Sequence, residues 1–203
     1  MTPTTEFEHL IVFGTVMVAA WFLALYFWPR ALLSVFKRAM LVKGFDDGPI
    51  PVNTLYVQSE QSFADPVGAT TGSSLATTGV NRDTLMSAGW LDLRNGPQLL
   101  HVPDAADRYY SVQLTDPFTN TNFAYVGTRT TGSKAGDYLI TGPGWTGRPP
   151  SGTTRISSPR HSVLVIARVL VYDEGDLAHA HDLAKQIRIS APPAPAHFSD
   201  TTP

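Results

Sequence analysis

A run of nineteen residues near the N-terminus, Leu10 to Trp28, carries no formal charge. As an α-helix at about 1.5 Å per residue, this run extends roughly 28 Å, which is close to the hydrocarbon thickness of a bilayer. No basic residue precedes it, and bulky residues 26–28 stand where signal-peptide cleavage requires small ones. The pattern therefore predicts an uncleaved transmembrane helix over residues 10–28, after an N-terminal tail over 1–9. A helix buried under another chain is the alternative.

Residues 29–44 are predicted to form an amphipathic helix, with Leu32 and Phe36 on one face and Lys37 and Arg38 on another. These basic residues follow the apolar run, so the positive-inside rule would place the rest of the chain in the cytoplasm. The same charges are equally explained as the solvated face of the helix. The lysine-poor, threonine-rich remainder favours the extracytoplasmic side, and we adopt that side as the expectation.

From residue 45 to residue 190 the pattern changes to short apolar segments between turns that contain glycine and proline. Within 108–114, Tyr110, Val112 and Leu114 alternate with polar or amphipathic residues, as in a strand with one buried face. Strands at this spacing predict a mainly β fold, an antiparallel sandwich or jelly-roll-like domain. The predicted strands cover residues 90–93, 98–102, 108–114, 137–141 and 162–172.

Two side chains in this region are predicted to be structural. Arg168 interrupts the otherwise apolar run 163–171 of a predicted central strand, so we expect it to be buried against a carboxylate or backbone carbonyls. Trp145 lies between glycine-containing turns and is expected to anchor the core. A short C-terminal helix should be capped at its N-terminus by Asp176, and the tail over 191–203 should be disordered.

The balance of 15 Lys and Arg against 17 Asp and Glu gives a net charge of −2, which argues against nucleic acid as a partner. With no cysteine, the chain has no disulfide, thiolate metal site or cysteine nucleophile. His179 and His181 are two residues apart on a predicted helix and point away from each other, so no metal site is expected. Neither a phosphate-binding loop nor a G-x-S-x-G motif is present, and we expect no cofactor.

Three polar clusters at predicted strand ends, residues 79–85, 116–120 and 127–132, supply the candidate chemistry. Asparagine, aspartate and threonine beside glycine and proline are typical of turns, which is the simplest explanation of each cluster. Together they also suggest a shared polar ligand site. A hydrolase is the alternative, in which Asp83 and Asp116 form a carboxylate pair separated by about 5 Å for a retaining mechanism or about 6.5–9.5 Å for an inverting one. The candidate ligand-binding residues are Asn81, Asp83, Asp116, Asn120 and Arg129.

The segment GVNRDTLMSAGWLDL, followed by GPQLLHVPDAADRYYSVQLTDPFTNTN and GTRTTGSKAGDYLITGPGWTG, resembles the bacterial and viral family catalogued as domain of unknown function 1254. The resemblance extends from about Tyr26 to about Ser190. It implies a β-rich, sandwich-like domain, often in exported proteins, that is normally followed in the same chain by a second uncharacterised β domain. Glycoside hydrolysis has been proposed for some full-length members. Met86 and Phe118 replace a tyrosine and a tryptophan common in the family, which argues against carbohydrate chemistry.

These observations favour a single-pass, membrane-anchored auxiliary or binding protein over an enzyme. Because the second β domain of the family does not follow residue 190, we expect a separate polypeptide to supply it. The expected partners are therefore the lipid bilayer and another protein subunit of a membrane-associated complex.

Overall fold

The computed structural model divides the chain into two compact units, Met1–Ala39 and Met40–Pro203, and we describe each by itself. Asn81 and most of the predicted C-terminal tail lie outside the described residues. The structure describes residues 3–44, 48–60, 63 and 83–193.

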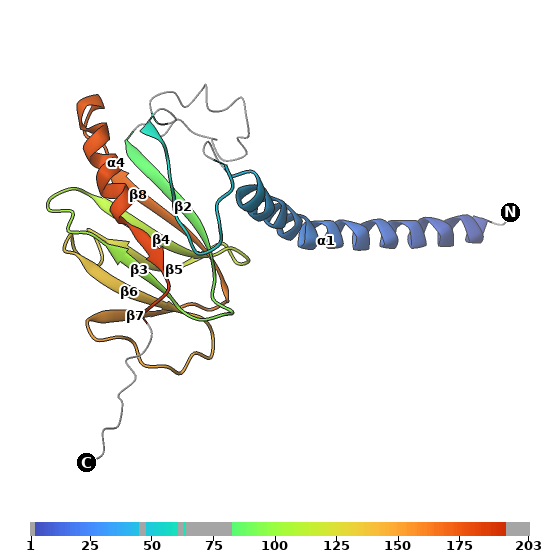
Figure 1. The fold of residues 1–203 in the computed structure, drawn as a ribbon. Helices are drawn as coiled ribbons and strands as arrows, with labels where there is room; N and C mark the ends of the chain where they lie inside the picture. Colours follow the sequence, from blue (N-terminus) through green and yellow to red (C-terminus); the bar gives the residue numbers. More distant parts are fainter. Residues whose placement is uncertain (1–2, 45–47, 61–62, 64–82, 194–203) are drawn as a thin grey trace, which may run out of the picture. The chain divides into compact units, whose positions relative to one another are not determined.

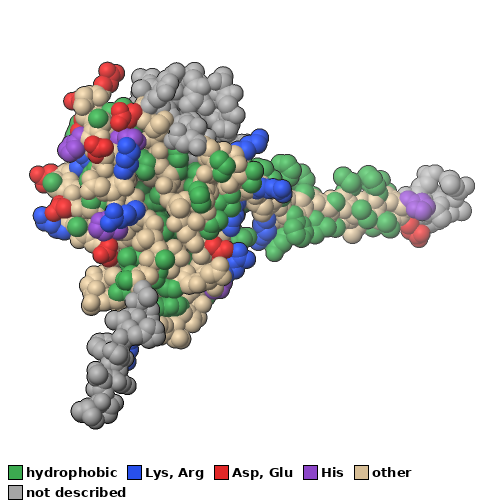
Figure 2. Space-filling model, in the orientation of Figure 1, with side chains coloured by type: hydrophobic (Ala, Val, Ile, Leu, Met, Phe, Trp, Pro, Cys, Tyr) green, Lys and Arg blue, Asp and Glu red, His purple; other side chains and the backbone are tan. Residues whose placement is uncertain are grey.

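The first unit contains most of the helix α1 (Pro3–Val42), which continues without a break through Pro29. Residues 3–9, expected as a tail, belong to this helix, and the segments expected as two helices form one. Large apolar side chains along it are exposed, among them Trp21 at 64% and Trp28 at 71%. In Figure 2 hydrophobic and uncharged side chains cover its middle, and charged ones lie toward its ends. Over Phe7–Val42 the helix is long and apolar enough to cross a membrane.

The second unit is a sandwich of two β-sheets, which confirms the predicted fold class (Figure 1). The strand order is β1-β2-β8-β4-β5 in one sheet and β7-β6-β3-β9 in the other. Neighbouring strands are antiparallel, except that β6 and β7 run parallel. The strands are β1 (Tyr56–Val57), β2 (Thr84–Asp92), β3 (Gln98–Val102), β4 (Tyr110–Asp116), β5 (Thr121–Gly127), β6 (Gly136–Thr141), β7 (Thr153–Ser157), β8 (Ser162–Leu170) and β9 (Arg188–Ser190).

The hydrophobic core lies between the sheets, and β8 is central to it. Val163, Val165, Ala167 and Val169 are fully buried, and they pack in one cluster with residues of the second sheet such as Leu100. Residues alternate between the two faces of a strand, so the even-numbered residues of β8 point away from this core. Five predicted strands are confirmed as β2, β3, β4, β6 and β8.

The expectation that Arg168 is a buried structural residue is wrong. Arg168 occupies an outward-facing position of β8 and its side chain is exposed. Its Nη1 lies 3.5 Å from Thr84 Oγ1, and its neighbours across the sheet are Met86 and Ser111. The charge therefore stays in contact with solvent, and the strand needs no buried carboxylate to compensate it.

Trp145 is half-buried and does not belong to the hydrophobic core, so its expected role as a core anchor is also wrong. Arg155 from the edge strand β7 lies over the indole ring, 4.9 Å from its centroid. Nη2 of the same arginine donates a hydrogen bond to the Trp145 carbonyl oxygen at 2.9 Å. The tryptophan thus packs in the loop after β6 through a cation–π contact.

A 3₁₀ turn, η1 (Glu174–Asp176), leads into the helix α4 (Leu177–Gln186), which buries Ala180 and Ala184 in the core. Asp176 precedes α4 as predicted, but its side chain does not cap the helix. Both of its carboxylate oxygens instead accept hydrogen bonds from the buried guanidinium of Arg108. Arg108 Nη1 also donates to the Leu170 carbonyl oxygen at 2.7 Å, which ties the start of α4 to the end of β8.

This ion pair predicts an acid dependence of stability. Arg108 lowers the pKa of Asp176 from its ordinary value of 3.8 to about 2. Because the folded-state pKa is depressed, the stabilisation is present above about pH 4 and is lost as the pH falls toward 2. We expect Asp176→Asn to reduce the free energy of unfolding by about 2 kcal/mol at pH 7. The difference from wild type should approach zero at about pH 2.

Urea unfolding of the full-length protein in detergent, repeated between pH 7 and pH 2, measures this difference. Asp182→Asn is the matched control, because it removes the same charge from an exposed position of α4. A pH-independent loss in Asp176→Asn, or an equal loss in Asp182→Asn, would contradict the assignment.

Candidate functional site

The two candidate catalytic carboxylates lie at opposite ends of the five-stranded sheet. Val171, just after β8, donates its backbone N–H to the Asp83 carbonyl oxygen at 2.9 Å. Asp116 follows Thr115, which pairs with Leu164 near the beginning of β8. Seven residues of extended chain, from 164 to 171, separate these points by roughly 23 Å. This distance greatly exceeds the spacing that glycoside hydrolysis requires, so the hydrolase alternative based on this pair is wrong.

The other candidates divide between the same two ends. Asn120 lies in the turn between β4 and β5, beside Asp116, and has a positive φ of 53°. Arg129 follows β5 at the other end, where its guanidinium lies 5.2 Å from the centroid of the Tyr109 ring. Thus Asp83 and Arg129 share one end and Asp116 and Asn120 the other. The described members of the predicted ligand set do not form a single site.

Asp116 is a buried carboxylate, with only 4% of its side chain exposed. Oδ1 accepts a hydrogen bond from the backbone N–H of Phe118 at 3.0 Å. Oδ2 accepts from Thr119 Oγ1 at 2.9 Å and from Arg160 Nε at 3.1 Å. The first two contacts are local, as expected for an aspartate that begins a turn. Burial alone would raise the pKa of Asp116, but these hydrogen bonds outweigh it and lower the pKa below its ordinary value.

A pocket of about 480 Å³ opens beside this carboxylate. Arg160 reaches it from the loop between β7 and β8 and lies 5.4 Å from the centroid of the Phe118 ring. The loop is held by Ser158, whose Oγ donates to the Arg160 carbonyl oxygen at 2.7 Å and accepts from its N–H at 3.3 Å. We call this the Arg160 pocket. Its lining residues are Asp116, Thr119, Thr121, Phe123, Pro159 and Arg160.

Sequence reasoning missed Arg160. It is 44 residues from Asp116 in the chain, and an arginine in a proline-containing loop carries no local signal of a distant carboxylate. Only the pairing of β4 with β8 brings the β4–β5 turn close to the β7–β8 loop.

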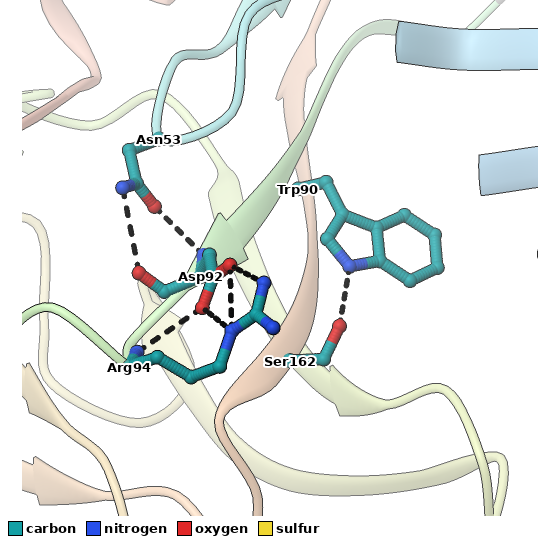
Figure 3. A network of polar contacts seen from close by, with 5 residues as sticks. All are labelled: Asn53, Trp90, Asp92, Arg94 and Ser162. Atoms are coloured by element: carbon teal, nitrogen blue, oxygen red, sulfur yellow. Dashed lines mark hydrogen bonds and ion pairs between the residues drawn. The ribbon is translucent and has the colours of Figure 1, made fainter. Parts of the chain in front are cut away.

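A second polar network lies at the end of β2 (Figure 3). The side-chain oxygen of Asn53 accepts a hydrogen bond from the Asp92 N–H at 2.8 Å. The backbone N–H of Asn53 donates a hydrogen bond to the Trp90 carbonyl oxygen at 2.9 Å. Arg94 Nε lies 2.9 Å from one carboxylate oxygen of Asp92, and Trp90 Nε1 donates to Ser162 Oγ at 2.6 Å. These contacts fasten the segment before β1 to the end of β2, which is a structural role.

A histidine–aspartate pair joins two neighbouring strands of the second sheet. His101 in β3 lies directly opposite Asp137 in β6, and Nδ1 is 2.7 Å from Oδ1. Both side chains are partly exposed, at 29% and 43%. The strand register explains the pair, which the separate positions in the sequence did not reveal. Over the residues that the structure describes, no three histidine, aspartate or glutamate side chains gather as metal ligands would.

Residues 62–191, well over half of the chain, match the model of a family described as "Protein of unknown function (DUF1254)". The chain belongs to the DUF1254 family. The crystal structure of the VPA0106 protein from Vibrio parahaemolyticus is similar, with 23% sequence identity and a TM-score of 0.53 over 71% of this chain. The match spans 39% of the Vibrio chain, so the present chain corresponds to well under half of that protein. This likeness supports the β fold.

A putative uncharacterized protein from Burkholderia cenocepacia aligns with 59% of this chain and 31% of its own, at 11% identity and a TM-score of 0.35. No curated protein matches the chain. All residues of the Arg160 pocket lie within the matched range, so the pocket belongs to the DUF1254 domain itself. The helix α1 lies outside that range.

Proposed function

We propose that the protein is a single-pass, membrane-anchored binding protein whose DUF1254 domain acts as an auxiliary subunit of a membrane-associated complex. The observation that carries the anchor is the apolar helix. Within Phe7–Val42, the most apolar 18-residue segment of the helix contains no buried residue. Large side chains such as Leu10, Phe22 and Trp28 are more than half exposed. A contiguous apolar surface of this extent is unfavourable in water and is satisfied by a lipid bilayer.

The geometry of the candidate carboxylates favours binding over catalysis. Asp116 is buried, accepts three hydrogen bonds and has a lowered pKa, so it remains an ionised acceptor at neutral pH. A general acid requires a raised pKa, which is the opposite shift. Asp83, at the far end of the sheet, is too distant to act with it. These contacts support a role for Asp116 in stabilising the loops that form a binding surface.

The DUF1254 domain is proposed to lie on the extracytoplasmic side. Beyond Gly44 the chain contains only Lys134 and Lys185 among its lysines, and threonine is abundant instead. The basic residues Lys37 and Arg38 argue for the other side by the positive-inside rule, but both belong to the continuous helix α1. The two locations give opposite patterns of chemical labelling.

The absence of cysteine from the chain makes single-cysteine labelling a direct test of topology. We expect Thr146→Cys, at an exposed loop position, to react with a membrane-impermeant maleimide on intact spheroplasts. His9→Cys, on the other side of the apolar run, should react only after permeabilisation. Both variants should stay in the membrane after alkaline carbonate extraction. Release by carbonate would contradict the anchor, and the reversed labelling pattern would contradict the proposed side.

The partner in this proposal is a separate polypeptide. The similar Vibrio protein continues well beyond the part that matches this chain, which is consistent with a DUF1254 domain that works beside further protein. We expect the full-length protein, purified in mild detergent after crosslinking, to retain a second membrane polypeptide in fixed stoichiometry.

The control is α1 fused to an unrelated soluble domain, which should not retain that polypeptide. Reciprocal purification through the second polypeptide should recover the full-length protein. Recovery of the full-length protein alone, or equal capture by the fusion, would contradict an auxiliary role of the DUF1254 domain.

A further inference from the structure

The guanidinium of Arg160 is held in place, yet most of its hydrogen-bond donors are unused. Nε donates to Asp116, and the guanidinium carbon lies over the Phe118 ring, 5.4 Å from its centroid. An arginine side chain has five N–H donors, so four remain on the two Nη nitrogens. Within the part of the chain that the structure describes, these nitrogens make no hydrogen bond, and the side chain is 52% exposed.

The surroundings of this group combine hydroxyls with apolar walls. Thr119 and Thr121 contribute hydroxyls, and Phe123 and Pro159 contribute apolar surface. The Thr119 hydroxyl donates its proton to Asp116, which leaves its oxygen as an acceptor for a ligand. A ligand that fits this lining carries an acceptor group for Arg160, hydroxyl donors and a compact carbon skeleton.

We propose that the Arg160 pocket binds a small organic carboxylate that also carries hydroxyl groups. The two Nη nitrogens present parallel N–H donors, which match the two oxygens of a carboxylate. Asp116, buried beside the guanidinium, compensates much of its charge. A singly charged carboxylate is therefore better matched than a doubly charged phosphate, which would be repelled more strongly by the same aspartate.

Asp116 acts in this site as a positioning residue. It accepts the Nε hydrogen bond and so leaves the Nη edge of the guanidinium directed away from itself, and the Phe118 ring lies against the same guanidinium. Preorganisation of this kind reduces the conformational entropy that an arginine loses when it binds a ligand. Ligand binding at this pocket requires neither the membrane anchor nor the partner subunit.

Gluconate and sorbitol test the proposal as a matched pair, because they share a six-carbon polyhydroxyl skeleton and differ at the carboxylate. The measurement is saturation-transfer difference NMR on the full-length protein in nanodiscs of phosphatidylcholine. We expect saturable gluconate binding and at least about tenfold weaker sorbitol binding, the effect of one charge-assisted contact. Inorganic phosphate should compete with gluconate only weakly. Equal binding of gluconate and sorbitol, no binding of either, or stronger binding of phosphate would overturn the proposal.

Three variants locate the site. Arg160→Gln should weaken gluconate binding at least about tenfold, and Arg160→Lys should weaken it by a smaller factor, because lysine keeps the charge and loses the planar pair of donors. Arg168→Gln is the control, since it removes the same charge from an exposed arginine on the outward face of β8. Circular dichroism of each variant checks the fold. Wild-type affinity in Arg160→Gln, or an equal loss in Arg168→Gln, would overturn the assignment.

Discussion

The double pairing of β8, with β2 on one side and β4 on the other, is the constraint on which the rest of the β unit depends. Its odd-numbered residues fill the core with valine and alanine, so a shift of one residue would bury Arg168 and expose those side chains. The same register determines which loops meet. It places Asp83 at one end of the sheet and Asp116 at the other, and thereby separates two carboxylates that the sequence suggested as partners.

The Arg160 pocket follows from this register together with one buried carboxylate. The Asp116 carboxylate stabilises its own turn by accepting hydrogen bonds from the Phe118 N–H and the Thr119 hydroxyl. It also accepts a hydrogen bond from Arg160 in the β7–β8 loop. A charge that is nine-tenths buried persists only with such partners. The aspartate that stabilises the turn therefore also orients the guanidinium that we propose as the carboxylate-binding group.

Local patterns were sufficient for the fold class, the apolar helix and the five strands with clear alternation. They were not sufficient for the edge strands β5 and β7, in which residues such as Thr121 and Arg155 are exposed and no regular alternation of buried and exposed positions marks the strand. Arg168 was misplaced because a strand with two apolar faces does not reveal which face is solvated. Asp116 was among the predicted site residues, but Arg160 was not, since their contact depends on long-range strand pairing that a single sequence does not encode locally.

The separation of the two ends of the sheet can be measured directly. Spin labels on Asp83→Cys and Thr121→Cys, both exposed positions in a chain without other cysteines, report the distance by pulsed electron–electron double resonance. Thr121 lies opposite Asp116 in the β4–β5 pair, so it marks the end that carries the pocket. We expect a label-to-label distance above about 25 Å, because seven residues of extended chain and the lateral offset between strands separate the two positions. A distance below about 15 Å would place the two carboxylates in one site and would show that the described strand register is wrong.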